Sequence, residues 1–240
     1  MNIALVGYGK MGKAIERIAL SRGHVIVSII DVENTDDFFS ETFRSADVAI
    51  EFTTPQTAFD NYMRCFAAGV PVVSGTTGWL ERFAEVKQVC LAGKHTFFYA
   101  SNFSIGVNIF FVLNAYLAKI MNKFPAYDVN LTEIHHIHKA DAPSGTAITL
   151  AGEIVRNVER KTQWQLADAP TVQPSHLLIQ SIREGETPGT HRIIYESNVD
   201  SISIRHEAKS REGFAQGAVI AAEFTAGKQG CLGMEDMLTF

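Results

Sequence analysis

The sequence predicts an α/β chain with two parts: a parallel sheet covered by helices, and a smaller α+β part with a mixed sheet of about four strands. The first observation is a glycine-rich turn between a short apolar run and a helix near the N-terminus. The second is a series of short apolar runs that alternate with helical segments up to about residue 100, which is typical of βα units. The third is a change after residue 105, where strands of alternating polarity replace the continuous apolar runs.

The first element is the apolar run at 3–6, which is typical of a strand buried on both faces. It is followed by the turn Gly7-Tyr8-Gly9-Lys10-Met11-Gly12, a helix that ends near Ser21, and a second apolar run at 25–30. That run ends in Asp31. A G-x-G-x-x-G turn between strand and helix, with an acid about 20 residues further on, predicts a Rossmann-like dinucleotide-binding domain.

Each residue of this fingerprint has a physical role. Gly7 permits the tight turn, Gly9 lets a pyrophosphate approach the backbone, and Gly12 lets the helix pack closely on the strand. Asp31 is placed to accept hydrogen bonds from the adenosine ribose hydroxyls, although an acid here is also a common strand-end residue. Its charge favours NADH over NADPH, whereas Lys10 is able to contact a phosphate. The cofactor is therefore predicted as NADH and/or NADPH.

The next elements continue the same alternation. Strands are expected at 47–52, 70–74 and 96–99, separated by helices at about 56–68 and 80–92. In open α/β sheets ligands bind outside the carboxyl ends of the strands, so the loops after these strands should line the cofactor groove. Those loops contain Phe52-Thr53-Thr54, Gly75-Thr76-Thr77 and Ala100-Ser101-Asn102-Phe103. Each of them also suits an ordinary turn.

The later elements differ in pattern. A long apolar helix is expected at 106–122, a strand at 127–134, a helix at about 144–158 and a polar loop at 161–174. Strands at 176–183, 191–195 and 201–206 then complete the small sheet. A last helix at 211–226 is expected to pack on the first part, because a parallel sheet needs helices on both faces.

The most polar segment of the chain is the run 133–147, with three imidazoles, an ammonium group and two carboxylates. Ser144 suits the N-cap of the helix that follows, which leaves the amides of Gly145 and Thr146 free. Free amides at the positive end of a helix favour an anion, and Lys139 adds charge nearby. The run therefore predicts a carboxylate or phosphate site beside a proton donor; the alternative is an ordinary capped helix after a polar loop.

Composition excludes several classes. The chain has 240 residues, 46% of them hydrophobic, and a net charge of −5, which argues against a nucleic-acid partner. The N-terminus lacks a signal-peptide pattern, and no apolar stretch is long enough to predict a membrane span. Cys65, Cys90 and Cys231 are far apart in sequence and predict free thiols in a reducing, cytoplasmic compartment.

Three other functions fit parts of the pattern. One is a different Rossmann oxidoreductase that acts on an amino or keto acid. Another is a metal site at His135, His136 and His138 with Asp141, which is disfavoured because adjacent side chains on a strand point in opposite directions. No metal is therefore expected. The third is a non-catalytic NAD sensor. A nucleophilic Ser144 is disfavoured, since no G-x-S-x-G motif surrounds it.

Several motifs together resemble the 4-hydroxy-tetrahydrodipicolinate reductase (dihydrodipicolinate reductase) family, and the resemblance covers nearly the whole chain. The most specific is Glu133-Ile134-His135-His136, followed by Lys139, Asp141 and Pro143-Ser144-Gly145-Thr146-Ala147. The others are the glycine turn, Phe52 to Pro55, Gly75 to Gly78, Ser101 to Ser104, Pro188 to His191 and Ser210 to Ala215.

This resemblance implies NAD(P)H-dependent reduction of a cyclic dicarboxylate in the diaminopimelate route to lysine, by a cytoplasmic homotetramer. It implies a dinucleotide-binding domain at 1–105 and 207–240, and a substrate-binding and oligomerisation domain at 106–206. His135 resembles the proton donor and Lys139 a second donor that also binds substrate, while His136, Gly145 and Thr146 resemble the carboxylate contacts. The implied cofactor contacts are Gly7, Tyr8, Gly9, Lys10, Met11, Gly12, Asp31, Gly75, Thr76, Thr77, Ala100, Ser101, Asn102 and Phe103.

Two departures from the family stand out: Ile137 occupies a position where some relatives carry Arg, and the chain is short. The implied chemistry agrees with the residues, because an imidazole with an ordinary pKa of about 6.5 donates a proton near neutral pH. If the polar run is extended, His135 and Lys139 fall on the same side of it.

Overall fold

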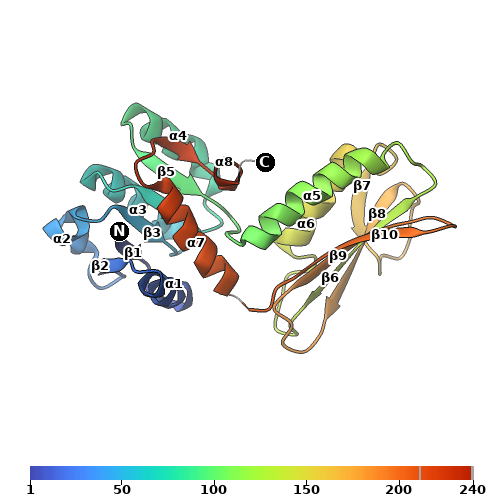
Figure 1. Cartoon of the computed structure of the whole chain (residues 1–240), viewed down its shortest axis with the longest axis horizontal. Helices are drawn as coiled ribbons and strands as arrows, with labels where there is room; N and C mark the ends of the chain where they lie inside the picture. The colour runs from blue at the N-terminus through green and yellow to red at the C-terminus, as the bar shows by residue number, and fades with distance from the viewer. Residues whose placement is uncertain (211, 239–240) are drawn as a thin grey trace. The chain divides into compact units, whose positions relative to one another are not determined.

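The computed structural model describes residues 1–210 and 212–238. The chain divides into two compact units, Met1–Ile105 together with Glu212–Phe240, and Gly106–Arg211. Figure 1 follows the chain from blue to red and shows that the C-terminal segment returns to the unit in which the chain begins. Within the described residues, no helix combines the length and the apolar character that a membrane span requires.

The first unit contains a parallel sheet in the order β11-β5-β4-β3-β1-β2. Its strands are β1 (Asn2–Val6), β2 (Val25–Ile30), β3 (Val48–Glu51), β4 (Val72–Ser74), β5 (Thr96–Tyr99) and β11 (Gly230–Leu232). Five of these strands were expected from the sequence. The sixth, β11, was not expected, and it pairs with β5 at one edge of the sheet.

Helices cover both faces of this sheet. One face packs against α1 (Lys10–Ser21), α7 (Glu212–Thr225) and the short α8 (Met234–Met237), and Figure 1 shows α7 in red beside α1 in dark blue. The other face packs against α2 (Glu41–Arg44), α3 (Pro55–Ala68) and α4 (Phe83–Ala92). Along β1, Ile3 and Leu5 enter one core while Ala4 and Val6 enter the other. Burial on both faces explains why the run is continuously apolar.

At two positions of the fingerprint only glycine fits, because a side chain would collide with the backbone. A Cβ on Gly7, whose φ is +91°, would lie 2.1 Å from the carbonyl oxygen of Phe52. A Cβ on Gly12 would lie 2.3 Å from the carbonyl oxygen of Gly7. A Cβ on Gly9, in contrast, would meet nothing within 4 Å. The predicted roles of Gly7 and Gly12 in the turn and in close packing are thus confirmed, and Gly9 leaves its backbone open.

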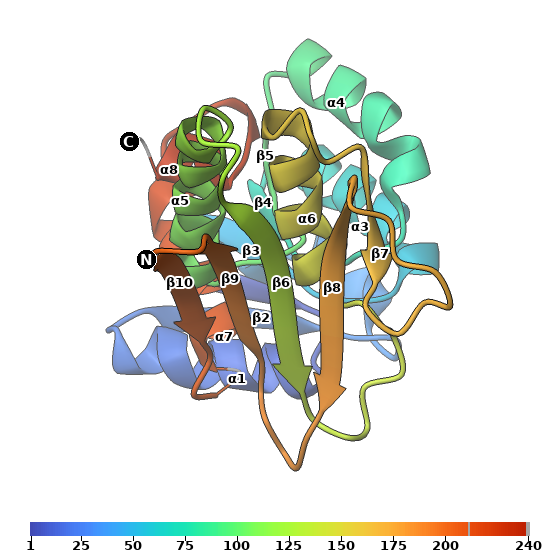
Figure 2. The same cartoon turned by 90° about the vertical axis from the view of Figure 1, so that its right-hand side faces the viewer.

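The second unit contains a mixed sheet in the order β10-β9-β6-β8-β7 (Figure 2). Its strands are β6 (Asp128–His135), β7 (Gln163–Leu166), β8 (His176–Arg183), β9 (Thr190–Glu196) and β10 (Ser201–Glu207). β6 and β7 are parallel to β8, whereas β9 is antiparallel to β6 and β10. The sheet has five strands rather than about four, because the segment expected to be a loop at 161–174 includes β7.

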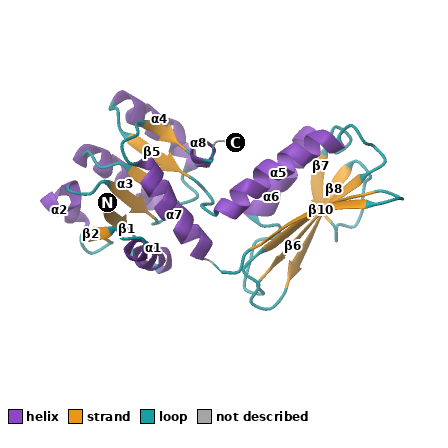
Figure 3. Ribbon diagram, viewed as in Figure 1, coloured by secondary structure: helices purple, strands orange, loops and turns teal. Residues whose placement is uncertain are grey.

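Two helices pack on one face of this sheet, α5 (Ile105–Met121) and α6 (Gly145–Asn157), shown in purple in Figure 3. The side-chain amide of Asn114 in α5 donates a hydrogen bond of 3.0 Å to the carbonyl oxygen of Leu150 in α6. Along β6 every second residue is buried, and this inward face runs from Val129 and Leu131 to Glu133 and His135. The sheet therefore presents one face that is apolar over most of its length and polar at the carboxyl end of β6.

Candidate active site

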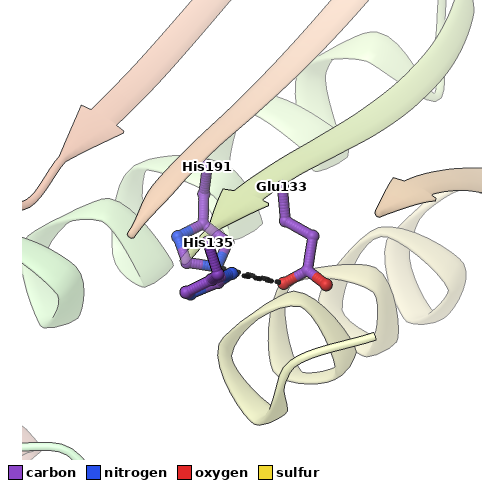
Figure 4. A group of neighbouring side chains, drawn as sticks. All are labelled: Glu133, His135 and His191. Atoms are coloured by element: carbon purple, nitrogen blue, oxygen red, sulfur yellow. Dashed lines mark ion pairs between the residues drawn. The ribbon is translucent and has the colours of Figure 1, made fainter. Parts of the chain in front are cut away.

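The register of the sheet gathers polar side chains at the carboxyl end of β6. Glu133 pairs with His191 on β9 and with Ser181 on β8, and His135 pairs with Arg183 on β8. Figure 4 shows Glu133 and His135 projecting from β6 beside the imidazole of His191. Three neighbouring strands thus bring a carboxylate, two imidazoles and a guanidinium to one place.

Glu133 is completely buried, and its two carboxylate oxygens have different partners. Its Oε1 atom accepts hydrogen bonds from the backbone amide of Ser144 at 3.0 Å and the hydroxyl of Ser181 at 2.8 Å. The guanidinium of Arg183 lies 3.4 Å from the same oxygen. Burial by itself raises the pKa of Glu133, but the interactions with His135, Ser144 and Ser181 outweigh it and hold that pKa well below its usual range. Glu133 is therefore an ionised carboxylate at neutral pH.

The second oxygen of Glu133 faces the imidazoles. Oε2 lies 3.2 Å from Nδ1 of His135 and 3.8 Å from Nε2 of His191. The two rings are edge to face, with centroids 5.2 Å apart. Gly189 lies against the His135 ring, since a Cβ at Gly189 would be 3.1 Å from His135 Nε2. Burial and the neighbouring His135 lower the pKa of His191 to about 4, so His191 is neutral at pH 7.

The start of α6 is built as the sequence predicted. Ser144 is the N-cap, and its hydroxyl accepts a hydrogen bond of 3.2 Å from the amide of Ala147. The amides of Gly145 and Thr146 have no hydrogen-bond partner among residues 1–210 and 212–238. The space above Gly145 is open, because a Cβ there would meet nothing within 4 Å. These two amides are therefore free to bind an anion by donating hydrogen bonds to it.

The polar segment after β6 is a turn and not an extended chain. The amide of Lys139 donates to the carbonyl of His136 at 3.1 Å, so the argument that placed His135 and Lys139 on one side of an extended segment is wrong. The Lys139 ammonium bonds to both carboxylate oxygens of Asp141, at 2.7 and 2.8 Å, and this contact lowers the pKa of Asp141. Arg183 donates to the backbone carbonyls of Lys139 and Asp141 and so joins this turn to β8.

The remaining histidines of the run lie apart from the buried cluster. His136 is half-buried, and its ring is 6.0 Å from that of His138. His138 is exposed and pairs with Glu186 at 2.9 Å. Ile137 is 59% exposed. The group considered for a metal in the sequence, His135, His136, His138 and Asp141, is therefore not the group that the fold brings together.

The described residues do contain one set with metal-ligand chemistry: Glu133, His135 and His191, whose ligand atoms lie within 4.8 Å of one another. A cation there would compete with Arg183 for the carboxylate and with Ser144, whose hydroxyl lies 3.2 Å from His191 Nε2. The contacts favour a hydrogen-bonded cluster, and the expectation of no functional metal stays a prediction that elemental analysis of the purified protein tests.

In the first unit, a pocket of about 340 Å³ lies at the carboxyl edge of the sheet. It is lined by Gly7, Tyr8 and Gly9 from the glycine turn, by Asp31 after β2, and by Thr53 and Thr54 after β3. The open backbone at Gly9 and the carboxylate at Asp31 fit the pyrophosphate and the ribose of a dinucleotide. The other expected cofactor residues do not line this pocket: Lys10, Met11, Gly12, Gly75, Thr76, Thr77 and Ala100 to Phe103.

Two of these expected residues are committed to the protein itself. The Phe103 side chain is buried and stacks with Phe98 at 5.9 Å, so a contact with cofactor would come from its backbone. Thr76 is also buried, and its hydroxyl donates to Glu51 at 2.9 Å and accepts from the amide of Thr53 at 2.7 Å. Glu51, which the sequence did not single out, thus connects the loops after β3 and β4.

The sequence also missed His191, Ser181 and Arg183 as parts of the cluster. All three lie on strands whose pairing with β6 is a long-range property. A signal existed for His191, because it ends one of the motifs, Pro188 to His191, that carried the family resemblance.

Comparison with known proteins agrees with this geometry. The family models for the N-terminus and the C-terminus of dihydrodipicolinate reductase match residues 1–103 and 106–238. The 4-hydroxy-tetrahydrodipicolinate reductase of Christiangramia forsetii is 48% identical over 243 residues, covering 100% of this chain and 98% of that protein. The enzyme of the same name from Archaeoglobus fulgidus is 35% identical over 268 residues, covering 99% and 100%.

A solved structure is similar in fold: the dipicolinate-bound dihydrodipicolinate reductase from Paenisporosarcina sp. TG-14 has a TM-score of 0.76 at 23% identity, covering 99% of each chain. Both halves of this chain thus match one family, and the match covers almost the full length of the two relatives named above. The chain belongs to the dihydrodipicolinate reductase (4-hydroxy-tetrahydrodipicolinate reductase) family.

Proposed function

We propose that this chain reduces 4-hydroxy-tetrahydrodipicolinate to tetrahydrodipicolinate with a nicotinamide cofactor, in the diaminopimelate route to lysine. The observation that carries the proposal is the match of both halves to one reductase family together with the buried histidine cluster beside the open start of α6. When bound, the reduced nicotinamide supplies the hydride. The substrate loses water, and the protein has to provide a proton and hold two carboxylates.

His135 is the proposed proton donor. It is almost fully buried at the end of β6, and Glu133 faces its Nδ1 atom, which leaves Nε2 as the nitrogen for exchange with substrate. Lys139, which is partly exposed and paired with Asp141, is the proposed second donor and a contact for a substrate carboxylate. A carboxylate that binds Lys139 would replace Asp141 as the partner of the ammonium.

The second substrate carboxylate is proposed to bind at the start of α6. The amides of Gly145 and Thr146 supply two donors at the positive end of a thirteen-residue helix. His136, half-buried after β6, is proposed to add a contact with the same substrate. This arrangement assigns each carboxylate its own group of donors, as a cyclic dicarboxylate requires.

For the cofactor we propose that both NADH and NADPH are accepted and that NADH is preferred. The Asp31 carboxylate lines the pocket at the carboxyl edge of the sheet, where it would repel the 2′-phosphate of NADPH. The other residues proposed to contact the cofactor are those of the glycine turn and of the loops after β4 and β5.

We also propose a cytoplasmic homotetramer. The three cysteines are free thiols, which suits a reducing compartment. One face of α5 exposes five large apolar side chains, and such a face suits burial between subunits: Ile109, Val112, Leu113, Tyr116 and Ile120. Light scattering coupled to size-exclusion chromatography measures the subunit number; a monomer at micromolar concentration would contradict the tetramer.

The test of function is the initial rate of NADH and NADPH oxidation with substrate formed in place from pyruvate and aspartate semialdehyde. Turnover is expected with wild type and is expected to vanish in the His135→Ala/Lys139→Ala double variant while NADH still binds. If folded wild-type protein binds NADH but oxidises neither cofactor, the chain is a different dehydrogenase or a sensor.

The single variant Lys139→Ala separates substrate binding from cofactor binding. We expect kcat/KM for the substrate to fall by about a hundredfold, because both a proton donor and a carboxylate contact are lost. The NADH dissociation constant should not change. His138→Ala is the matched control, since His138 lies on the surface and pairs with the exposed Glu186. A large loss of NADH affinity in Lys139→Ala would count against the assignment.

A further inference from the structure

We propose that Glu133 is a positioning residue that fixes the protonated nitrogen of His135 and, through its other oxygen, the start of α6. The inference rests on the proposed role of His135 as proton donor. It goes beyond that role because Glu133 acts on both halves of the substrate site, the proton donor and the anion-binding amides.

The first step of the argument is the orientation of the carboxylate. Ser144, Ser181 and Arg183 approach Oε1 from a helix start and a neighbouring strand, at 3.0, 2.8 and 3.4 Å. Since three donors contact one oxygen, rotation of the carboxylate would break several interactions. Oε2 is therefore held toward the imidazoles.

The second step concerns two buried polar atoms that lack other hydrogen-bond partners within the described part of the chain, one on Glu133 and one on His135. Oε2 of Glu133 and Nδ1 of His135 lie 3.2 Å apart, and neither has another hydrogen-bond partner among the described residues. A buried carboxylate oxygen without a donor is costly, so Nδ1 is expected to carry the proton that it needs. His135 is then fixed as the tautomer protonated at Nδ1.

The third step is the consequence for proton transfer. With Nδ1 protonated and facing a carboxylate, Nε2 is the nitrogen left for the substrate, and the Nε2–H of the imidazolium is the proton that the substrate receives. The Nε2–H bond breaks, a bond from that proton to the substrate forms, and the neutral ring keeps its Nδ1 proton. Glu133 does not itself take up a proton.

The groups around His135 agree with this assignment. His191 on β9 is neutral at pH 7, and its Nε2 atom lies 3.2 Å from the Ser144 hydroxyl, which accepts from the amide of Ala147. From β8 comes the Arg183 guanidinium, which pairs with Oε1 of Glu133 rather than with the ring. The other titratable groups nearby are Lys139 paired with Asp141, His136 on the following turn, His206 on β10, and the exposed Glu184 and Glu186.

The final step connects the two halves of the site. The amide of Ser144 that bonds to Glu133 immediately precedes the open amides of Gly145 and Thr146. One side chain thus sets both the direction of the donor histidine and the position of the first turn of α6. Glu133 would therefore set the distance between the two groups that a substrate contacts, the His135 imidazole and the first turn of α6.

The test is the isosteric variant Glu133→Gln in the full-length enzyme. Its side-chain oxygen is still able to accept from Ser144 and Ser181, but its amide group now faces Nδ1 and forces the opposite tautomer. We expect an unchanged NADH dissociation constant, a substrate KM within about threefold, and kcat lower by about a hundredfold or more. The high-pH limb of the kcat profile, where the donor loses its proton, should shift to lower pH.

Two controls separate positioning from a general structural role. Ser181→Ala removes a donor to Oε1 but leaves Oε2 against His135, so its kcat should fall less than about fivefold with an unmoved pH profile. In a His135→Ala background, adding Glu133→Gln should cause no further loss of kcat, because the group on which Glu133 acts is already absent. If the full loss persists in that background, Glu133 acts independently of His135 and the proposal is wrong.

A measurement on the wild type covers the case in which Glu133→Gln does not fold. In enzyme labelled with ¹⁵N-histidine, the His135 resonances, assigned by comparison with His135→Ala, should show Nδ1 protonated at every pH and Nε2 titrating. A neutral His135 protonated only at Nε2 would overturn the proposal. Failure of the proposed function is a different result, the absence of turnover by wild type with both cofactors.

Discussion

The hydroxyl of Thr76 donates a 2.9 Å hydrogen bond to the buried carboxyl of Glu51 at the end of β3. Ser74, the last residue of β4, donates to the other oxygen of the same carboxyl at 2.7 Å. The amide of Thr53, a pocket residue, in turn donates to Thr76 at 2.7 Å. Burial raises the pKa of Glu51, whose carboxyl thus joins the loops after β3 and β4 in a buried hydrogen-bond network.

The first prediction concerns Thr76. Thr76→Val keeps the shape of the side chain but removes a donor to Glu51 and an acceptor for Thr53, so the free energy of unfolding should fall by about 1–3 kcal/mol. NADH affinity should fall as well, through the displaced Thr53 loop. Urea unfolding and fluorescence titration measure the two effects. Thr77→Val is the control, since Thr77 is exposed and should leave stability unchanged. Equal stability of the two variants would contradict this prediction.

Gly9 and Gly12 provide a second test, because they belong to one turn but differ in the room that each leaves for a side chain. Gly12→Ala puts a Cβ 2.3 Å from the Gly7 carbonyl oxygen and should lower the free energy of unfolding by about 1–3 kcal/mol. Gly9→Ala meets open space and should leave the melting temperature near that of wild type, yet weaken NADH binding where the pyrophosphate approaches. A Gly9→Ala variant that binds NADH normally would show that no phosphate lies there.

The preference between cofactors depends on Asp31. We expect Asp31→Ala to reduce the ratio of kcat/KM for NADH to that for NADPH by about tenfold, because contacts with the ribose hydroxyls and repulsion of a 2′-phosphate are both lost. Steady-state kinetics with each cofactor measures the ratio. Glu33→Ala provides the control: this exposed carboxylate lies two residues further along and does not line the pocket. An equal change in both variants would indicate a general charge effect.

The low pKa of His191 predicts how stability depends on pH. Its folded pKa of about 4 lies below the ordinary value of 6.5, so the unfolded chain binds more protons between these limits. Stability from this group is complete above pH 6.5 and falls as the pH drops toward 4, by on the order of 3 kcal/mol.

In His191→Gln this dependence should be weaker, with a slope reduced by up to one proton between pH 6.5 and 4. Urea unfolding at several pH values measures the slope in each protein. His138→Gln, which changes an exposed histidine, should retain the slope of wild type. If His191→Gln also retains it, His191 is not buried as a neutral group.

How far the sequence predicts the fold depends on whether an element forms from local or distant interactions. Strands β5 and β8 have the predicted bounds, because each is an apolar or alternating run between turn residues. The strands β7 and β11 were missed. Each is short and lies at the outer edge of its sheet, so its formation depends on pairing with β8 or β5 more than on its own residues.

The same distinction applies to the candidate site. Ser144 as an N-cap follows from local chemistry, and the prediction is confirmed. The position of His191 opposite Glu133 follows from strand register, which a local pattern does not reveal. The relation between His135 and Lys139 was mistaken for a related reason: a single backbone hydrogen bond from Lys139 to His136 converts the expected extended segment into a turn.

The path of the chain has a consequence for synthesis on the ribosome. The sheet of the first unit is completed by β11, and one of its cores is filled by Ala218, Val219 and Ala222 of α7. All of these residues are translated after residues 106–211, which takes roughly 5–20 s at 5–20 residues per second. During that interval the nascent first unit lacks α7 on one face of its sheet and has an unpaired strand edge at β5, whereas the second unit has its full sequence as soon as the interval ends. The earliest part of the chain to be made is thus among the last to finish folding.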